Sequence, residues 1–145
     1  MRLTLDELLG DARARIERLT PFEALAAAAN GALIVDIRSD GAREDGVVPG
    51  SIHVPRTVLE WRADPDSPWR NPHLAGLDQR LVVLCDHGYS SSFAAATLVD
   101  LGFRAGEVIG GFEAWREAGL AVATPTDRRK PGELPGMGPP EPGLG

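Results

Sequence analysis

Hydrophobic and polar positions change their spacing along the chain, and each change predicts a new element. Short apolar runs, rich in β-branched residues, predict buried strands at 32–37, 51–55, 80–85 and 105–109. Apolar residues at helical spacing predict helices over 5–18, 21–29, 91–101 and 111–118. Because strands alternate with helices, the pattern predicts an α/β fold, with a parallel sheet and helices on both faces.

Length and local composition divide the chain into three parts. The 145 residues suffice for one domain with a substantial core. We expect an N-terminal helix in residues 1–20 and the folded domain in residues 21–123. From residue 124 the chain reads TPTDRRKPGELPGMGPPEPGLG, where Pro and Gly dominate. Such a composition cannot build a core, so residues 124–145 are expected to form a disordered tail.

Charge and composition exclude several classes of function. The net charge of −6 argues against nucleic acid or an anionic membrane as a partner. No apolar run reaches the roughly 18 residues of a membrane span, and the early acidic residues do not resemble a signal peptide. One cysteine and three scattered histidines lack the spacing of metal ligands. A lone thiol suits a reducing compartment, so we expect a cytoplasmic protein without a metal.

The single cysteine, Cys85, ends one of the predicted strands and precedes a short loop and an alanine-rich helix. Ligands of open α/β sheets bind at the carboxyl ends of strands. A helix N-terminus presents free N–H groups and a partial positive charge, which favour a reactive thiolate. Gly88 would let the loop turn so that several N–H groups point at the sulfur. These features alone fit equally well a small buried residue without chemistry.

Four segments together resemble the rhodanese (sulfurtransferase) family, in that family's order. The loop CDHGYS is similar to the active-site pattern Cys-x-x-Gly-x-Thr/Ser/Arg. The other three segments are LIVDIRS, EDGVVPGSIHVPR and AGEVIGGFEAWREAGLAV, and the resemblance spans about residues 31–122. It implies a rhodanese-like domain with a five-stranded parallel sheet, and an activity that uses neither a metal nor an organic cofactor.

The resemblance also implies a mechanism. Cys85 takes a sulfane sulfur from a thiosulfate- or persulfide-type donor, becomes a persulfide, and passes the sulfur to a thiol or cyanide acceptor. The donor is a small molecule or a partner protein's persulfide. Backbone N–H groups of residues 86–91 would cradle the sulfur. The residues expected to contact substrate are Asp86, His87, Gly88, Tyr89, Ser90, Ser91, Arg38 and Arg56.

Several of these residues admit a second interpretation. Arg38 and Arg56 follow strands whose carboxyl ends should face the cleft, where they would bind an anionic donor or stay solvated. Ser90 would donate to the sulfur, cap the helix, or both. His87 would add positive potential or simply be exposed. Asp36 is expected to be structural near the site, accepting hydrogen bonds from loop N–H groups.

Two further features separate the alternatives. Thiosulfate-preferring relatives tend to carry cations after the cysteine, whereas this chain has Asp86 and His87, which favours a neutral or protein-bound persulfide donor. A cysteine phosphatase would need Cys-x5-Arg to clamp an oxyanion, and position 91 is serine. A non-catalytic rhodanese module, acting as sulfur carrier or regulator, is the other alternative.

The sequence leaves open whether Trp61 and Trp69 cover the core or line the cleft.

Overall fold

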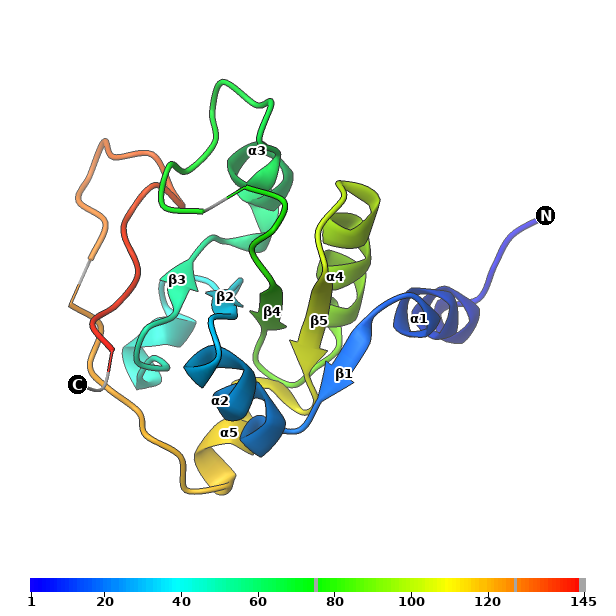
Figure 1. Cartoon of the computed structure of the whole chain (residues 1–145), viewed down its shortest axis with the longest axis horizontal. Helices are drawn as coiled ribbons and strands as arrows, with labels where there is room; N and C mark the ends of the chain where they lie inside the picture. Colours follow the sequence, from blue (N-terminus) through cyan, green and yellow to red (C-terminus); the bar gives the residue numbers. More distant parts are fainter. Residues whose placement is uncertain (75, 127, 144–145) are drawn as a thin grey trace.

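The structure, a computed structural model, describes residues 1–74, 76–126 and 128–143 (Figure 1). The α-helices are α1 Leu5–Ala14, α2 Pro21–Ala29, α3 Leu59–Ala63, α4 Ser90–Asp100 and α5 Gly111–Glu117. The strands are β1 Glu17–Leu19, β2 Leu33–Asp36, β3 Ile52–His53, β4 Leu81–Leu84 and β5 Ala105–Val108. Two 3₁₀ turns, η1 Ala42–Asp45 and η2 Arg56–Val58, lie on either side of β3.

The five strands form one parallel sheet in the order β1-β5-β4-β2-β3. Strand β4 lies at the centre, with Val83 paired to Val35 of β2 and to Glu107 of β5. The central position explains why β4 is buried along its whole length and reads as a continuous apolar run. The predicted parallel α/β architecture is therefore confirmed.

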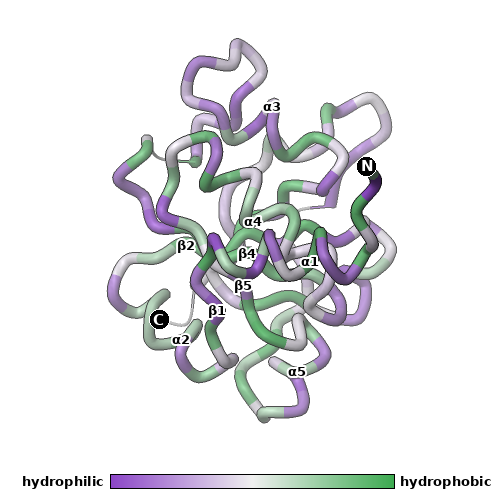
Figure 2. The backbone as a smooth tube through the Cα atoms, turned by 90° about the vertical axis from the view of Figure 1, so that its right-hand side faces the viewer, coloured by the Kyte–Doolittle hydropathy of each residue, from purple (hydrophilic) through white to green (hydrophobic). Residues whose placement is uncertain are grey.

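Helices cover both faces of the sheet and enclose two apolar layers. On one face, α3 and α4 pack over alternate strand residues, including Val83 and Cys85. On the other face, α2 and α5 pack over the intervening residues, including Val82 and Leu84. Figure 2 shows hydrophobic residues gathered in the central strands and hydrophilic residues in the outer loops. The period-two alternation of β4 thus directs Cys85 toward the α3 and α4 side.

The predicted helix over residues 5–18 is too long. Helix α1 ends at Ala14, and Glu17–Leu19 forms the edge strand β1, paired in parallel with β5. The pairing is close because Gly106 has no side chain, and an added Cβ there would lie 2.5 Å from the Glu17 carbonyl oxygen. Tertiary pairing thus overrides the local helical pattern, and the residues expected to be only an N-terminal helix contribute a strand.

The expectation of a disordered tail over residues 124–145 is wrong for its described part. Asn71 donates from its side-chain amide to the Gly136 carbonyl at 2.8 Å. Arg43 and Glu141, both buried, form an ion pair with an N–O distance of 2.9 Å. A segment with few apolar side chains is therefore held by hydrogen bonds and one buried charge pair. Within the tail, residues 127, 144 and 145 lie outside the described part.

Candidate active site

Cys85 follows the last residue of β4 and is almost fully buried, with 4% of its surface exposed. Its sulfur accepts a hydrogen bond from the backbone N–H of Gly88, with an N–Sγ distance of 3.1 Å. The loop therefore curls back on the sulfur. The sequence predicted several such N–H groups, and the hydrogen bond found among the described residues comes from Gly88. A donor aimed at sulfur stabilises it best when the sulfur is negatively charged.

The loop after Cys85 packs against the start of α5 at two points where only glycine fits. Gly88 has φ of 86°, and a Cβ there would lie 2.7 Å from the Gly110 nitrogen. Gly111 approaches the Cys85 carbonyl so closely that a side chain would clash with it. Next along the chain, the Phe112 N–H donates to the same carbonyl at 2.8 Å. These close backbone approaches hold the loop against the start of α5.

Helix α4 begins directly after the loop. Tyr89 is its N-cap residue, and no side chain of the described residues caps this end. The serine expected as a cap, Ser90, is instead the first helical residue and is exposed. The uncapped first turn leaves backbone N–H groups and the positive end of the helix dipole beside the Cys85 loop. This arrangement favours an anionic sulfur species at the loop.

A buried carboxylate, Glu107 of β5, lies beneath the first turn of α4. It is fully buried and accepts hydrogen bonds from the hydroxyls of Ser91 at 2.6 Å and Ser92 at 2.7 Å. Arg18 of the β1 strand donates to it from Nε at 3.0 Å. The Ser91 side chain, expected to contact substrate, is therefore committed to Glu107 and is itself fully buried. Only its backbone N–H remains for the cradle.

Arg13 of α1 connects this network to the loop. Its Nη2 donates to the Gly88 carbonyl at 3.0 Å, and its Nε donates to the Ser92 hydroxyl at 3.1 Å. The guanidinium also lies 5.8 Å from the centroid of the Tyr89 ring. Sequence reasoning missed both Arg13 and Glu107. The available signal was an acid inside a run predicted to be buried, because such a charge requires partners.

Arg38 is not solvated, contrary to one of its two expected roles, and its contact with a donor remains a prediction. Its side chain is buried and donates to both carboxylate oxygens of Asp36, at 3.0 and 2.8 Å, and to the Gly46 carbonyl at 2.8 Å. The guanidinium stacks on Phe112, 4.0 Å from the ring centroid, and so lies on the α5 face of the sheet, opposite Cys85. Its donors are occupied by the interior. Asp36 also accepts a hydrogen bond from the Arg38 backbone N–H, as a structural residue of this loop would.

The remaining charged candidates lie at the surface. Arg56 forms an ion pair with Glu60 at 2.8 Å, so its guanidinium already has an acidic partner. His87 and Asp86 are exposed, and the His87 Nδ1 lies 2.6 Å from a carboxylate oxygen of Glu113. Contacts of these residues with substrate remain predictions. The immediate flank of the loop is thus acidic, with no lysine or arginine between residues 81 and 103.

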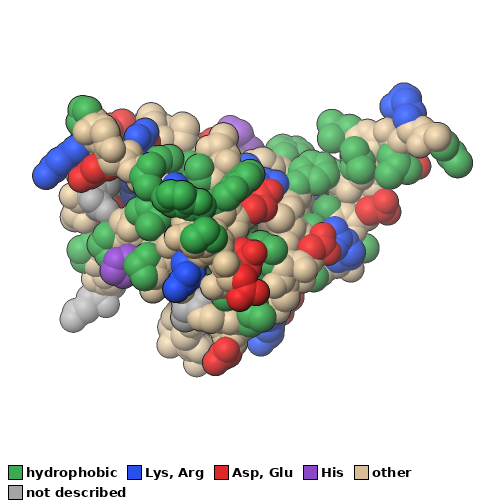
Figure 3. Space-filling view, turned by 90° about the horizontal axis from the view of Figure 1, so that it is seen from above, with side chains coloured by type: hydrophobic (Ala, Val, Ile, Leu, Met, Phe, Trp, Pro, Cys, Tyr) green, Lys and Arg blue, Asp and Glu red, His purple; other side chains and the backbone are tan. Residues whose placement is uncertain are grey.

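Trp61 and Trp69 do not cover the core. Their exposed fractions are 56% and 57%. Trp61 belongs to α3, and Figure 3 shows the face on that side of the molecule, where a group of hydrophobic side chains lies beside acidic and basic ones. The first alternative for these two residues is therefore wrong.

Within the described ranges, no group of three or more His, Cys, Asp or Glu side chains is arranged to hold a metal ion. Nor does any helix of those ranges combine the length and the apolar character that crossing a membrane requires.

A parallel five-stranded α/β domain with a loop-enclosed cysteine after its central strand, facing a helix N-terminus, is the design of rhodanese-like domains. The family model described as "Rhodanese-like domain" matches residues 20–118. The chain belongs to this family. The match begins after α1, so Arg13 and Arg18 lie outside the matched range.

Two curated relatives share one activity name. The thiosulfate sulfurtransferase GlpE of Pseudomonas syringae is 38% identical over 102 residues, which cover 69% of this chain and 87% of the relative. GlpE of Stutzerimonas stutzeri is 41% identical over 101 residues, covering 69% and 84%. The similarity therefore spans nearly the whole of these relatives.

Solved structures agree with the fold. A protein of unknown function from Rhodopseudomonas palustris, described as a possible tyrosine phosphatase, is 36% identical with a TM-score of 0.77, covering 84% of this chain and 96% of that one. A thiosulfate sulfurtransferase from Pseudomonas aeruginosa has a TM-score of 0.65 at 21% identity, covering 80% and 22%. The phosphatase description of the first has no counterpart here, because position 91 holds a serine bound to Glu107.

Proposed function

We propose that this protein is a sulfurtransferase that carries a sulfane sulfur as a persulfide on Cys85. The observation that carries the proposal is the hydrogen bond from the Gly88 N–H to the Cys85 sulfur, beside the uncapped N-terminus of α4. The GlpE relatives, named thiosulfate sulfurtransferases, support the same activity.

The proposed reaction has two displacement steps at sulfur. The Cys85 thiolate attacks the sulfane sulfur of the donor, a new S–S bond forms, and the donor's bond breaks with its electron pair leaving on sulfite or a thiolate. The acceptor, a thiolate or cyanide, then attacks the outer sulfur, and the electron pair returns to the Cys85 sulfur. Sulfur carries negative charge in both steps, so the Gly88 N–H and the α4 dipole would stabilise it without reorganising.

For the donor, we favour a persulfide over thiosulfate. Asp86 is exposed beside the nucleophile, and the Nδ1 of the nearby His87 lies 2.6 Å from a Glu113 carboxylate oxygen. An acidic flank repels a dianion more than a singly charged or protein-bound persulfide. Arg13, the cation held against the loop, would partly offset this repulsion. The reactive thiol would persist in the cytoplasm, where disulfides are rare.

The activity test measures thiocyanate released from cyanide with two donors, thiosulfate and glutathione persulfide. The proposal expects turnover by the wild-type protein with at least one donor, faster with the persulfide, and none by Cys85→Ser. A Glu117→Gln variant serves as a control, because it changes an exposed carboxylate of α5 and leaves the Cys85 loop intact. Turnover by Cys85→Ser equal to wild type would overturn the proposal.

The second candidate, a non-catalytic carrier or regulatory module, predicts a different result. Cys85 would take up a persulfide sulfur but release none to cyanide or to a small thiol. Retention of the sulfur over many minutes with both acceptors would favour that candidate over an enzyme.

A further inference from the structure

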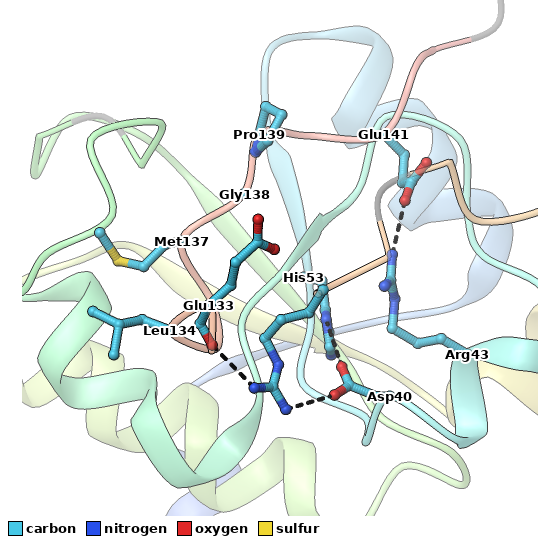
Figure 4. A pocket seen from close by; sticks show the side chains of 11 residues that line it. Asp40, Arg43, His53, Glu133, Leu134, Met137, Gly138, Pro139 and Glu141 are labelled. Atoms are coloured by element: carbon cyan, nitrogen blue, oxygen red, sulfur yellow. Dashed lines mark hydrogen bonds and ion pairs between the residues drawn. The ribbon is translucent and has the colours of Figure 1, made fainter. Parts of the chain in front are cut away.

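A second concave site lies away from Cys85, between the C-terminal segment and the β2–β3 side of the domain. Its volume is about 510 Å³, which is within the range of small-molecule sites. Figure 4 shows its walls, with Asp40, Arg43 and His53 contributed by the domain and Glu133 to Glu141 by the C-terminal segment. The segment docks through buried contacts, so the hollow is bounded by ordered chain on both sides.

This cavity is separate from the cysteine loop. His53 ends β3, and it pairs with Asp36 of β2, which in turn pairs with Leu84 of β4. Two strand spacings therefore lie between His53 and the strand that carries Cys85, and Cys85 is not among the lining residues. A ligand in this cavity would be recognised by chemistry of its own.

His53 and Asp40 each direct one hydrogen-bond acceptor toward the other. The His53 Nε2 lies 2.7 Å from the Arg38 carbonyl oxygen, which can only accept, so Nε2 carries the proton. Burial lowers the pKa of His53, only partly opposed by that hydrogen bond, which keeps the ring neutral near pH 7. Its Nδ1 is then an acceptor, 3.7 Å from the Asp40 Oδ1, too far for a hydrogen bond between them. A ligand N–H group would satisfy both atoms.

The charges of the lining leave one carboxylate in excess. Arg43 pairs with Glu141 at 2.9 Å, and Arg129 pairs with Asp40 Oδ2 at 3.1 Å. Within the described residues, the Glu133 carboxylate accepts a hydrogen bond from the Lys130 backbone N–H at 2.9 Å. With His53 neutral, three carboxylates face two guanidinium groups. The cavity is therefore suited to a cation rather than an anion.

The remaining wall is apolar. Leu134, Met137 and Pro139 line it, and in Figure 4 the Leu134 and Met137 side chains lie next to each other, to the left of the Glu133 carboxylate. Leu134 is 53% exposed, so covering it would remove apolar surface from water. A ligand that fits both walls has a cationic N–H donor at one end and a hydrocarbon part at the other.

We propose that this cavity binds a small organic amine, with its ammonium group donating to Asp40 Oδ1 and His53 Nδ1 and its hydrocarbon part lying on Leu134 and Met137. The Glu133 carboxylate supplies the balancing charge. This site is independent of sulfur transfer, and nothing in the proposal requires Cys85.

The test compares three probes of equal chain length by isothermal titration calorimetry of the full chain: n-pentylamine, 1-pentanol and pentanoate. The proposal expects saturable binding of the amine, on the order of tenfold tighter than the alcohol, and no binding of pentanoate. Glu133→Gln, which keeps an acceptor for the Lys130 N–H, and Asp40→Asn should each weaken amine binding about tenfold. The control Glu117→Gln removes an exposed carboxylate of α5 and should leave binding unchanged.

Three outcomes would overturn the proposal. They are equal binding of pentylamine and pentanol, no amine binding up to about 10 mM, and equal weakening by Glu117→Gln and Glu133→Gln. Circular dichroism of each variant confirms that the fold is retained. Because Cys85→Ser should bind the amine as the wild type does, failure here is distinguishable from failure of the sulfurtransferase proposal.

Discussion

Arg13 and Gly88, 75 positions apart in the chain, are joined by a hydrogen bond of 3.0 Å from the guanidinium to the carbonyl. Through it, α1 supports the loop that encloses the Cys85 sulfur. The same arginine reaches the Ser92 hydroxyl, which in turn bonds to the buried Glu107. A helix that lies before the family match at residues 20–118 thus takes part in holding the reactive loop.

Replacing Arg13 with alanine should slow the reaction of Cys85 with iodoacetamide about two- to fivefold near pH 7. The change removes a cation beside the loop and frees the Gly88 carbonyl, so the thiolate loses both charge stabilisation and a fixed donor. The measurement is the second-order alkylation rate, followed by mass. Arg15→Ala is the matched control, because Arg15 pairs with the exposed Asp100 at 2.6 Å. Equal rates for both variants would show that Arg13 does not position the loop.

Asp86→Arg should raise kcat/KM with thiosulfate by up to about tenfold, because it replaces a repelling charge beside the nucleophile with an attracting one. Activity with glutathione persulfide should change less, because its persulfide group carries at most one negative charge whereas thiosulfate is a dianion. The control is Asp66→Arg, the same charge change in the connection after α3, which Figure 1 shows far from α5. Unchanged or lower kcat/KM with thiosulfate would mean that Asp86 does not set donor preference.

The docked C-terminal segment predicts an acid-sensitive contribution to stability. Burial raises the pKa of Glu141, but hydrogen bonds from Thr126 and Arg43 outweigh it, and the folded-state pKa lies below the ordinary 4.5. A lowered pKa gives stability that is complete above 4.5 and is lost as the pH falls through the folded-state value. Glu141→Gln should therefore cost about 1–2 kcal/mol of unfolding free energy near neutral pH and much less near pH 3.

Urea titrations of wild type and Glu141→Gln at the two pH values measure this difference. Glu117→Gln, an exposed carboxylate of α5, should show no comparable cost at either pH. A cost for Glu141→Gln that stays constant down to pH 3 would contradict the assigned role of the Arg43–Glu141 pair.

The sequence predicts the parts of the fold that local pattern determines. The apolar runs at β2, β4 and β5 and the helices α2, α4 and α5 lie where the spacing predicts them, because each buries its apolar face in the way its period requires. The pattern cannot predict β1, since three residues carry little periodicity and its strand conformation comes from pairing with β5. The docked tail escapes prediction for a related reason: its partners, Asn71 and Arg43, are distant in sequence.

The candidate site divides in the same way. The Cys85 loop is contiguous, so its glycine and the following helix are readable from one segment. Arg38 follows a strand, so the sequence predicted that its side chain would reach a bound donor. Its guanidinium instead folds back onto Asp36, two residues earlier. Arg13 and Glu107 come from elements that meet only in the folded protein. The one sign of them in the sequence was the acidic residue Glu107 inside a run predicted to be buried.

Mass spectrometry of the intact protein after incubation with glutathione persulfide or thiosulfate tests the central claim most directly. The account predicts one adduct of about 32 Da, a single sulfur atom, located on Cys85 by peptide mapping and removed by cyanide. Cys85→Ser, with the same fold, should show none. No adduct on the wild-type protein with either donor, or an equal adduct on Cys85→Ser, would contradict a persulfide carried by Cys85.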